Sequence, residues 1–361
     1  MIPNKPILKK DYSGIMMTNN SMQLRNEENI MMLKGQSVSE IVEKLLPLLN
    51  GENTINQICE KIDDVPSDAV LKVIEMLQDH FVIEDGDDAT KTSLSENVLE
   101  AYSSQIDYLT LFSERILHDG TRVNKYKLFE NIYNKTCFVI GSGKVANAVI
   151  EELASNGIGN IIICSEESNT IKNLDDLKSA FPNVNFTIES LDNISSNEKI
   201  DMVIFADDII TDSKSKNINE LCINNNIPWI TVKMGEIRFE VGPLVVPHET
   251  ACYSCYTNRL NGNTAHYEEE ITYNNYKNLE SENISMFMSD TMIKVAVGIL
   301  TWEVIKYLSK IFSCVTTGRV IHFNILNLEM KTHTVLKMPK CKVCSNIESL
   351  PFTEPYAVYL P

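Results

Sequence analysis

Four of the nine cysteines stand in two C-x-x-C pairs, and this spacing constrains the fold more than any other feature of the chain. Each pair can place two thiolates on one edge of a tetrahedral Zn²⁺ site, and two pairs close the coordination shell. A closed shell leaves no open position for water, so a zinc ion held there would be structural. The alternative is four unrelated buried or redox-active thiols. We expect a structural zinc bound by Cys252, Cys255, Cys341 and Cys344.

The composition indicates the cellular compartment of the protein and excludes some classes of binding partner. The odd number of cysteines, and the lack of an apolar run after the lysine-containing segment 1–14, indicate a reducing, cytoplasmic setting. The most apolar long stretch, 292–308, contains Lys294, Glu303 and Lys306, so it predicts a buried helix and no membrane association. The net charge of −17 argues against nucleic acid as a general partner, because phosphate binding needs clustered Lys and Arg.

The first part of the chain, residues 1–86, predicts a small winged-helix-like module. Two short apolar runs, 22–25 and 30–34, are separated by Asn-Glu-Glu-Asn, which is typical of a β-hairpin. Three stretches with apolar residues at helical spacing follow, and Thr54 can cap the second of them. They occupy 38–49, 55–62 and 67–77. Residues 81–83 have the composition of a closing strand.

A helical linker over 87–130, with a helix predicted at 98–117, leads into a larger domain at 131–361. In that domain short apolar runs alternate with segments of helical periodicity, which is typical of a parallel sheet covered on both faces. The predicted strands are 137–140, 161–164, 186–188, 201–206 and 229–232. A helix at 291–310 and an antiparallel pair at 320–328 and 331–337 follow. The expected fold class is therefore α/β, with a Rossmann-like sheet domain.

A Gly-Ser-Gly sequence links the first predicted strand of this domain to the next helix. A nucleotide-binding loop belongs at this place, because backbone N–H groups and a helix N-terminus can approach a phosphate there. An acidic residue should then end the second strand and hold the ribose, but Ser165 stands at that position. Gly141 and Gly143 are equally well explained by the steric demands of the strand-to-helix turn.

Residues 141–164 and 241–255 together resemble the ThiF/MoeB family, whose members have a ubiquitin-activating-like fold, adenylate a carboxylate and carry a four-cysteine zinc. The segment 45–51, leading into Thr54, is similar to the peptide-binding element of enzymes that modify ribosomal peptides. In combination the chain resembles the ThiF-like partner proteins of thiazole/oxazole-modified peptide pathways, including thiopeptides and bacteriocins. Those proteins deliver the leader of a precursor peptide to a separate YcaO cyclodehydratase. The resemblance covers nearly the whole chain and also implies a homodimer formed through the sheet domain.

The resemblance implies that the nucleotide site is vestigial. The acidic residue that ends the second strand of active adenylating relatives is replaced by Ser165, and their metal-binding aspartate is matched by Asp208. Their Asn-x-x-Arg element corresponds to 169–172, where Lys172 stands in place of the arginine. Lysine cannot reproduce the planar, bidentate grip of arginine on phosphate, a loss of roughly 10²–10³-fold in rate. ATP is therefore not expected as a cofactor. The vestigial site comprises Gly141, Gly143, Ser165 and Asp208.

The family's recognition element binds the leader peptide as a strand added beside the hairpin and packed against the third helix. An exposed strand edge offers backbone hydrogen bonds, and alternate pockets read side chains. In this chain Ile30 and Met32 share one face of the strand, and Met31 and Leu33 share the other. We expect one of these pairs to lie in the core and the other to be partly exposed at the groove. The alternative is that all four side chains belong to the core. Arg25, Lys34 and Lys72 could pair with an acidic leader or be ordinary surface residues. The predicted peptide-binding residues are Asn29, Ile30, Met31, Met32, Leu33, Lys34, Lys72, Val73, Met76 and Leu77.

Three functions are weighed on these grounds. The leading hypothesis is a non-catalytic scaffold that binds the leader of a ribosomal precursor peptide and presents its core to a YcaO enzyme for azoline or thiazole formation. The second is an ATP-dependent, peptide-adenylating enzyme of the ThiF kind. The third, a winged-helix regulator that binds DNA, is disfavoured by the acidic charge and the lack of a basic recognition helix. The polar segment 261–282 fits either a disordered loop or a contact with a partner enzyme.

Overall fold

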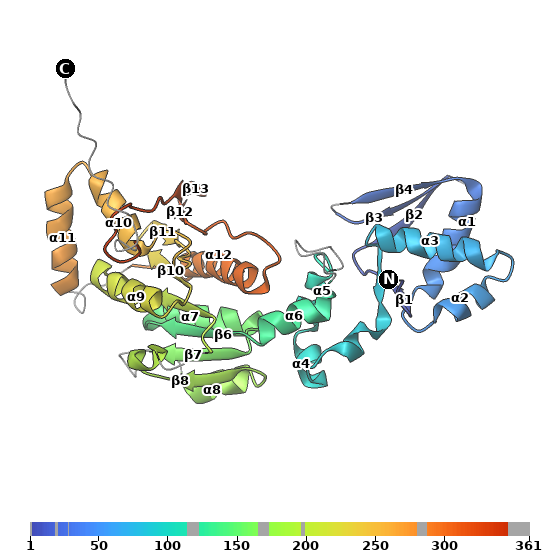
Figure 1. Ribbon diagram of the computed structural model, residues 1–361, viewed down its shortest axis with the longest axis horizontal. Helices are drawn as coiled ribbons and strands as arrows, with labels where there is room; N and C mark the ends of the chain where they lie inside the picture. The colour runs from blue at the N-terminus through green and yellow to red at the C-terminus, as the bar shows by residue number, and fades with distance from the viewer. Residues whose placement is uncertain are drawn as a thin grey trace, which may run out of the picture. The chain divides into compact units, whose positions relative to one another are not determined.

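The computed structural model describes residues 2–18, 21–27, 29–113, 123–164, 173–195, 199–279 and 287–345. The chain divides into two compact units, Met1–Ile132 and Tyr133–Pro361. Each unit is built around its own β-structure (Figure 1). Within the described ranges, no helix is both long and apolar enough to cross a membrane.

The first unit contains the predicted hairpin, extended by one further strand. β2 (Ser13–Thr18), β3 (Ser21–Arg25) and β4 (Ile30–Lys34) form an antiparallel sheet in the order β2-β3-β4. β1 (Pro6–Leu8) pairs with β5 (Ile83–Asp85) in a separate two-stranded sheet. The closing strand predicted at 81–83 thus begins later, because Phe81 has a φ of 58° and belongs to a turn.

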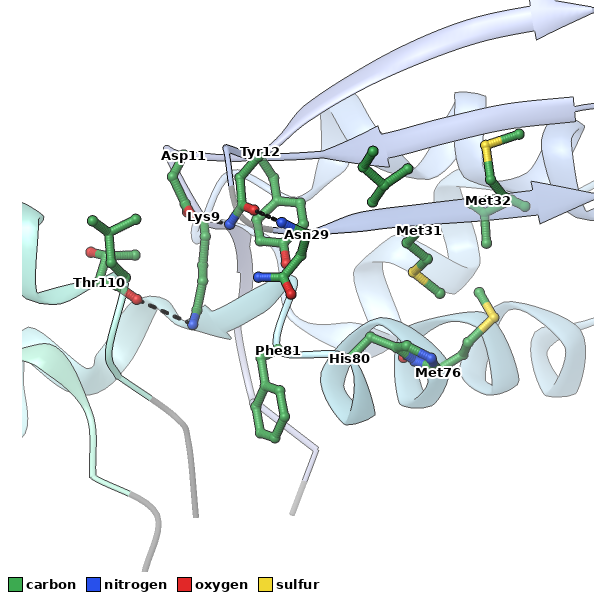
Figure 2. Close-up of a pocket in the computed structure, with 14 residues that line it drawn as sticks. Lys9, Asp11, Tyr12, Asn29, Met31, Met32, Met76, His80, Phe81 and Thr110 are labelled. Carbon is green, nitrogen blue, oxygen red and sulfur yellow. Dashed lines mark hydrogen bonds between the residues drawn. The ribbon is translucent and has the colours of Figure 1, made fainter. Parts of the chain in front are cut away.

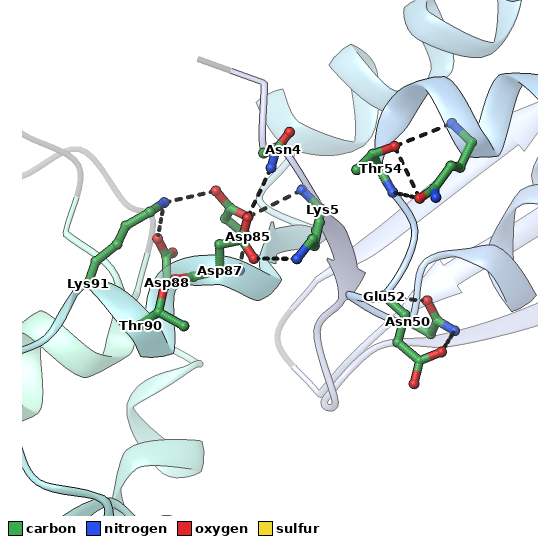
Figure 3. A network of polar contacts seen from close by, with 11 residues as sticks. Asn4, Lys5, Asn50, Glu52, Thr54, Asp85, Asp87, Asp88, Thr90 and Lys91 are labelled. Carbon is green, nitrogen blue, oxygen red and sulfur yellow. Dashed lines mark hydrogen bonds and ion pairs between the residues drawn. The ribbon is translucent and has the colours of Figure 1, made fainter.

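Three helices follow β4, as the periodicity predicts. They are α1 (Gln36–Leu45), α2 (Ile55–Lys61) and α3 (Ser67–Asp79). Pro47 lies in a short 3₁₀ turn, η1 (Leu46–Leu48), which follows α1 directly. Thr54 caps α2: its hydroxyl accepts from the Gln57 N–H at 3.4 Å, and the Gln57 side chain accepts from the Thr54 N–H at 2.8 Å (Figure 3). Apolar side chains of all three helices and of β3 meet in one core.

Polar contacts hold the segment around β5 in place. Lys5 Nζ lies 2.9 Å from Asp87 Oδ1, and Lys91 Nζ lies 3.0 Å from carboxylate oxygens of both Asp85 and Asp88 (Figure 3). The last residues of this network lie in the 3₁₀ helix η2 (Gly86–Lys91), which follows β5. The network therefore joins the N-terminal segment to the start of the linker.

Two helices stand in the described part of the range 98–117, where one long helix was predicted: α4 (Glu96–Ala101) and α5 (Ser103–Leu109). Residues 114–117 of that prediction lie outside the described residues, and α6 (Lys125–Tyr133) follows. The break falls at Tyr102, whose ring centroid packs 5.3 Å from that of Phe129 on α6. A buried ion pair of 2.7 Å joins Lys125 to Glu84 of β5, so α6 is tied to the first unit.

The second unit carries a sheet with the strand order β13-β12-β11-β10-β9-β6-β7-β8 in its described residues. The neighbours from β10 to β8 pair in parallel, which confirms the predicted α/β fold class, and the neighbours from β10 to β13 pair antiparallel. Residues 238–241 were not predicted as a strand. The strands are β6 (Thr136–Ile140), β7 (Asn160–Cys164), β8 (Asn185–Ile188), β9 (Met202–Ala206), β10 (Trp229–Met234), β11 (Arg238–Val241), β12 (Arg319–Asn324) and β13 (Glu329–Thr334).

Helices connect and flank these strands. The predicted buried helix is α12, which contacts α7, β10 and β11, and its Glu303 and Lys306 form a buried ion pair. α11 occupies much of the polar segment 261–282. The helices are α7 (Gly143–Ser155), α8 (Leu174–Ala180), η3 (Leu191–Ser195), α9 (Asp212–Asn224), α10 (Tyr253–Gly262), α11 (Tyr267–Leu279) and α12 (Asp290–Ser309).

Candidate functional site

β4 is an edge strand in the described part of the chain, because it pairs with β3 only. The hairpin closes with the Asn26 N–H donating to the Asn29 carbonyl at 3.0 Å. Hydrogen-bonded and non-hydrogen-bonded pairs alternate along an antiparallel ladder. Counting from the Asn26–Asn29 pair, the ladder bonds to β3 fall at positions 31 and 33. The backbone N–H and C=O groups of Ile30, Met32 and Lys34 therefore point to the open edge.

The side chains of β4 alternate between two environments. Leu33 is buried and Met31 is half-buried, and both pack on the core of the first unit. Ile30 and Met32 are 58% and 45% exposed on the opposite face of the sheet. Met31 and Leu33 are thus the inward pair, and the edge presents apolar side chains on both of its faces.

A pocket of about 680 Å³ lies between β4 and α3 (Figure 2). Met31 and Met76 point toward one another across it, while Met32 points to the other side of the strand (Figure 2). Six of the predicted peptide-binding residues line this pocket: Asn29, Ile30, Met31, Met32, Leu33 and Met76. The structure thus gathers these residues in one groove.

The other four predicted residues lie outside the lining. Lys34 and Lys72 are exposed at the surface. Val73 and Leu77 are buried in the core of the first unit, on the side of α3 that faces the other helices. Met76 is therefore the side chain through which α3 contributes to the groove from the predicted set.

One end of the pocket is polar, and no sequence motif indicated it. Lys9 and Asp11 come from the segment after β1, and Thr110 comes from the segment after α5. Lys9 is buried and donates to the carbonyls of Thr110 at 3.4 Å and Ser113 at 3.1 Å. Thr110 falls within the helix predicted at 98–117, whereas Lys9 and Asp11 belong to no predicted element, and only the tertiary fold brings them together.

The four cysteines of the two C-x-x-C pairs meet in one buried cluster, with their sulfur atoms all within 4.8 Å of one another. The Sγ–Sγ distances are 3.8 Å for Cys252–Cys255, 3.7 Å for Cys252–Cys341 and 3.5 Å for Cys255–Cys344. Disulfide bonds are about 2.05 Å long, so these are separate sulfur atoms. A tetrahedral zinc site with bonds of about 2.3 Å has sulfur–sulfur edges of about 3.8 Å. The donor set fits zinc.

The two loop glycines stand where a side chain would collide with neighbouring strand ends. A Cβ on Gly141 would lie 1.8 Å from the Ala206 carbonyl oxygen, and one on Gly143 would lie 2.3 Å from the carboxylate of Asp208. Their φ angles of 135° and 82° also favour glycine. Both glycines are therefore explained by sterics, whether or not a nucleotide binds.

Asp208 lies at the N-terminus of α7. Its Oδ1 accepts from the Val145 N–H at 2.9 Å, so the protein itself places a carboxylate where a phosphate would bind. Beside it is a pocket of about 290 Å³ at the ends of β6, β7 and β9. Burial raises the pKa of Asp207 in this pocket, and Lys214 opposes the shift. Ser165 and the Asn169–Lys172 element lie outside the described residues.

Comparison with protein families supports the fold. The ThiF family matches residues 175–344, which confirms the predicted resemblance over this part of the sheet domain. No curated protein matches the chain.

Solved structures match nearly the whole chain. E. coli MccB with AMPCPP and MccA is 17% identical, covers 94% of this chain and 99% of its own, and has a TM-score of 0.66. E. coli MccB with ATP is 16% identical, with the same coverages and a TM-score of 0.63. A heterocyclase in complex with substrate and cofactor is 18% identical, covers 94% of this chain and 39% of its own, and has a TM-score of 0.62. At these identities the likeness establishes the fold.

Proposed function

We propose that this protein binds the leader of a ribosomal precursor peptide as an added strand along β4. In this proposal it is a non-catalytic scaffold that presents the rest of the peptide to a separate YcaO-type cyclodehydratase for azoline or thiazole formation. The observation that carries the proposal is the open edge of β4 beside a methionine-lined groove. MccB, a microcin biosynthetic enzyme crystallised with MccA, and the heterocyclase solved in complex with its substrate support peptide processing as the setting.

The edge suits strand addition. A ligand strand can exchange hydrogen bonds with the backbone groups of Ile30, Met32 and Lys34, and each bond contributes roughly 1 kcal/mol net. Alternate ligand side chains would enter the groove between Met31 and Met76. Methionine is unbranched and polarizable, so such a groove adapts to apolar side chains of different shape.

The charge distribution suits an acidic ligand. No Asp or Glu occurs in β2, β3 or β4, although the chain as a whole has a net charge of −17. Arg25 and Lys34 are the cations of this sheet and are both exposed. Acidic side chains of the leader would be attracted to this end of the molecule, and the attraction would weaken with salt.

A scaffold role is supported by the residues that replace nucleotide-binding groups of active relatives. Asp208 matches their metal-binding aspartate, and a cation held there would lie between it and a phosphate, so Asp208 does not by itself argue against a nucleotide. Ser165 and Lys172 stand where those relatives have an acidic residue and an arginine, and lysine cannot grip a phosphate in the same bidentate way. We therefore propose no ATP chemistry for this chain. The zinc ion proposed at Cys252, Cys255, Cys341 and Cys344 would be structural, since four thiolates leave no position for a substrate.

Presentation by tethering explains how a non-catalytic protein can accelerate a reaction. Holding the leader raises the local concentration of the core peptide at a partner's active site without any new catalytic group. This chain spans 39% of the similar heterocyclase chain. We propose that the chemistry carried by the rest of such a chain is supplied here by a second protein.

A backbone methylation scan tests the peptide site. Fluorescent leader peptides encoded near the gene are measured for affinity, and each backbone N–H of a binding peptide is then replaced in turn by N-methyl. Strand addition predicts that methylation at every second position weakens binding about tenfold or more, because only alternate N–H groups face β4. Uniform tolerance would exclude strand addition, and a failure of all such peptides to bind would exclude the proposed function.

A second candidate function is ATP-dependent adenylation of the bound peptide. It is favoured by the pocket at the ends of β6, β7 and β9, which lies where nucleotides bind in sheets of this kind, and by the structure of MccB with ATP. Peptide-dependent exchange of pyrophosphate into ATP distinguishes the two functions. The scaffold predicts exchange at the background level, and robust exchange would establish the enzyme instead.

A further inference from the structure

The pocket beside β4 is lined by more than the winged-helix-like module at 1–86. Thr110 and Leu111 also line it, and both belong to the linker segment that follows α5. Leu111 is half-buried. Thr110 lies at the end of the pocket that is remote from Met32 (Figure 2). The groove between β4 and α3 therefore has a further wall, which we call the linker wall and define as residues 110–113.

Contacts from the segment between β1 and β2 hold the linker wall in place. Lys9 is buried, and its ammonium group donates to the carbonyls of Thr110 at 3.4 Å and Ser113 at 3.1 Å. The next residue, Lys10, forms an ion pair of 2.6 Å with Asp107 in the last turn of α5. Cations suit the C-terminal end of a helix, where carbonyl groups lack partners within the helix. Two adjacent lysines thus fix the linker wall from the side of the module.

A second set of contacts ties the same helix to α6 and β5. Lys125 Nζ lies 3.5 Å from Asp107 Oδ1 and 2.7 Å from Glu84 Oε1. The side chains of Lys125 and Glu84 are both buried, so this connection is shielded from solvent. The linker and the module accordingly belong to one compact unit, Met1–Ile132. The linker wall is therefore a fixed part of the surface that a peptide on β4 would meet.

We propose that the linker wall is part of the peptide site and that Leu111 is a specificity-determining residue, which packs on an apolar side chain of the bound peptide. The proposal rests on the proposed peptide-binding function and adds a contact outside β4 and α3. One pocket connects Leu111 with Met31 and Met76, so a peptide that adds to β4 and continues beyond Ile30 reaches the linker wall. Covering the half-buried leucine with an apolar group removes more of its surface from water, which stabilises the complex.

A peptide on the linker wall also stabilises the end of α5. The Thr110 N–H donates to the Asp107 carbonyl and the Ser113 N–H donates to the Leu109 carbonyl, both at 3.0 Å. Such bonds at a helix end open more readily than those of a core element, and a bound ligand suppresses the opening. The exchange of these N–H groups with solvent deuterium therefore reports whether the peptide covers them.

Hydrogen exchange of the unmodified, full-length protein tests the contact. The probe is the tightest-binding peptide of the methylation scan, with about eight to ten residues so that it extends beyond β4 at about 3.4 Å per residue. At saturation it should slow exchange at residues 110–113 about tenfold or more, together with β4 and α3. The control is α4, where the Val98 and Leu99 N–H groups bond to the Ser95 carbonyl and should exchange as before. Protection of β4 and α3 alone would overturn the linker wall as a peptide contact, and equal protection of α4 would overturn it as well.

A matched pair of variants tests the role of Leu111. Leu111→Ala removes the proposed contact, and Leu99→Ala is the control, because Leu99 is also a half-buried leucine of the linker but is not among the described residues that line the groove. Each apolar side chain of the peptide is replaced in turn by alanine. With the wild type, one replacement beyond the end of β4 should weaken binding about tenfold, and with Leu111→Ala the same replacement should cost about twofold or less. Leu99→Ala should keep the full effect.

The outcomes separate this proposal from the function on which it rests. If the methylation scan shows its alternating pattern but every peptide replacement has the same effect on Leu111→Ala as on the wild type, the peptide site stands and the role of Leu111 is wrong. If no peptide binds, the proposed function fails and the linker wall has no ligand. Because hydrogen exchange uses the unmodified protein, the test does not depend on the folding of any variant.

Discussion

At the scale of single residues, the loop before α7 illustrates how one pattern serves two purposes. Gly-x-Gly between a strand and a helix is typical of nucleotide sites, yet a Cβ at either glycine would also collide with atoms of the chain itself. Gly141 packs on the backbone of Ala206, and Gly143 packs on Asp208. Steric packing therefore requires both glycines, and Asp208 accepts a hydrogen bond from the Val145 N–H at the N-terminus of α7.

Gly141→Ala is expected to destabilise the second unit by more than about 2 kcal/mol, because the added Cβ would stand 1.8 Å from a backbone oxygen. Gly298→Ala is the control, since nothing lies within 4 Å of its Cβ position on α12. Helix propensity predicts that this control gains up to about 1 kcal/mol. Thermal unfolding of the two variants measures both effects. A Gly141→Ala protein as stable as the wild type would contradict the steric account.

Asp207 gives a pH-dependent prediction. Burial raises the pKa of Asp207 in the folded state above that of an exposed aspartate, so the folded protein binds its proton more tightly than the unfolded chain does. The contribution of Asp207 to stability is then present below about pH 3.8 and is lost as the pH rises through the folded pKa. Asp207→Asn should therefore unfold at a higher temperature than the wild type near pH 7, and the difference should vanish toward pH 3. An opposite trend would place Asp207 in a stabilising ion pair.

At the scale of elements, the β3–β4 ladder gives each residue of β4 a distinct role. Odd positions bond to β3, and even positions face the open edge. The inward side chain of Leu33 holds β4 on the core, while Ile30 and Met32 stay exposed. The strand thus has one face on the core, one edge hydrogen-bonded to β3 and one edge without a partner strand among the described residues.

Met32→Pro and Met31→Pro form a matched pair of variants that tests which backbone N–H groups of β4 bond to β3. Proline removes one backbone N–H and is tolerated in an edge strand when that N–H faces outward. Met32→Pro should keep the fold and weaken peptide binding about tenfold. Met31→Pro should break a bond to β3 and unfold the hairpin, which circular dichroism and thermal unfolding detect. Equal stability of the two variants would show that the ladder register is wrong.

At the scale of the whole molecule, the cysteine cluster joins segments far apart in the second unit. Cys252 immediately precedes α10, whereas Cys341 follows β13. All four cysteines belong to the same hydrophobic cluster as strand residues of the sheet. A metal at this point would hold the C-terminal segment on the sheet.

Metal analysis is expected to find about one zinc per chain. Cys341→Ser should lose the zinc and lower the unfolding temperature, because binding energy at a structural site is also folding energy. Cys59→Ser is the control, since Cys59 is half-buried in the first unit, away from the cluster. A protein that contains no zinc and yet folds stably would refute the four-cysteine site.

The sequence by itself determined the identity and order of most elements of this protein. Helical and strand periodicity predicted α1 to α3 and the parallel strands, and cysteine spacing predicted which thiols meet. These signals are local, because periodicity records which face of an element is buried and C-x-x-C records a fixed local geometry. The same locality explains two of the misses: the short strand β1 is defined by its distant partner β5, and the helix predicted at 98–117 breaks where Tyr102 meets Phe129. β11 is also short, and it pairs with the neighbouring β10 as well as with the distant β12.

Only the tertiary structure decided which residues line the groove. It placed Met31 and Met76 across from one another, and it brought Asp11 and Thr110, which are about a hundred residues apart, to the lining of one pocket. It also set Asp208 against the loop before α7. Neither the hydrogen bonds that hold the linker wall in place nor the openness of a strand edge is a property of a local segment. Both depend on which groups, distant in the sequence, the fold brings within hydrogen-bonding distance.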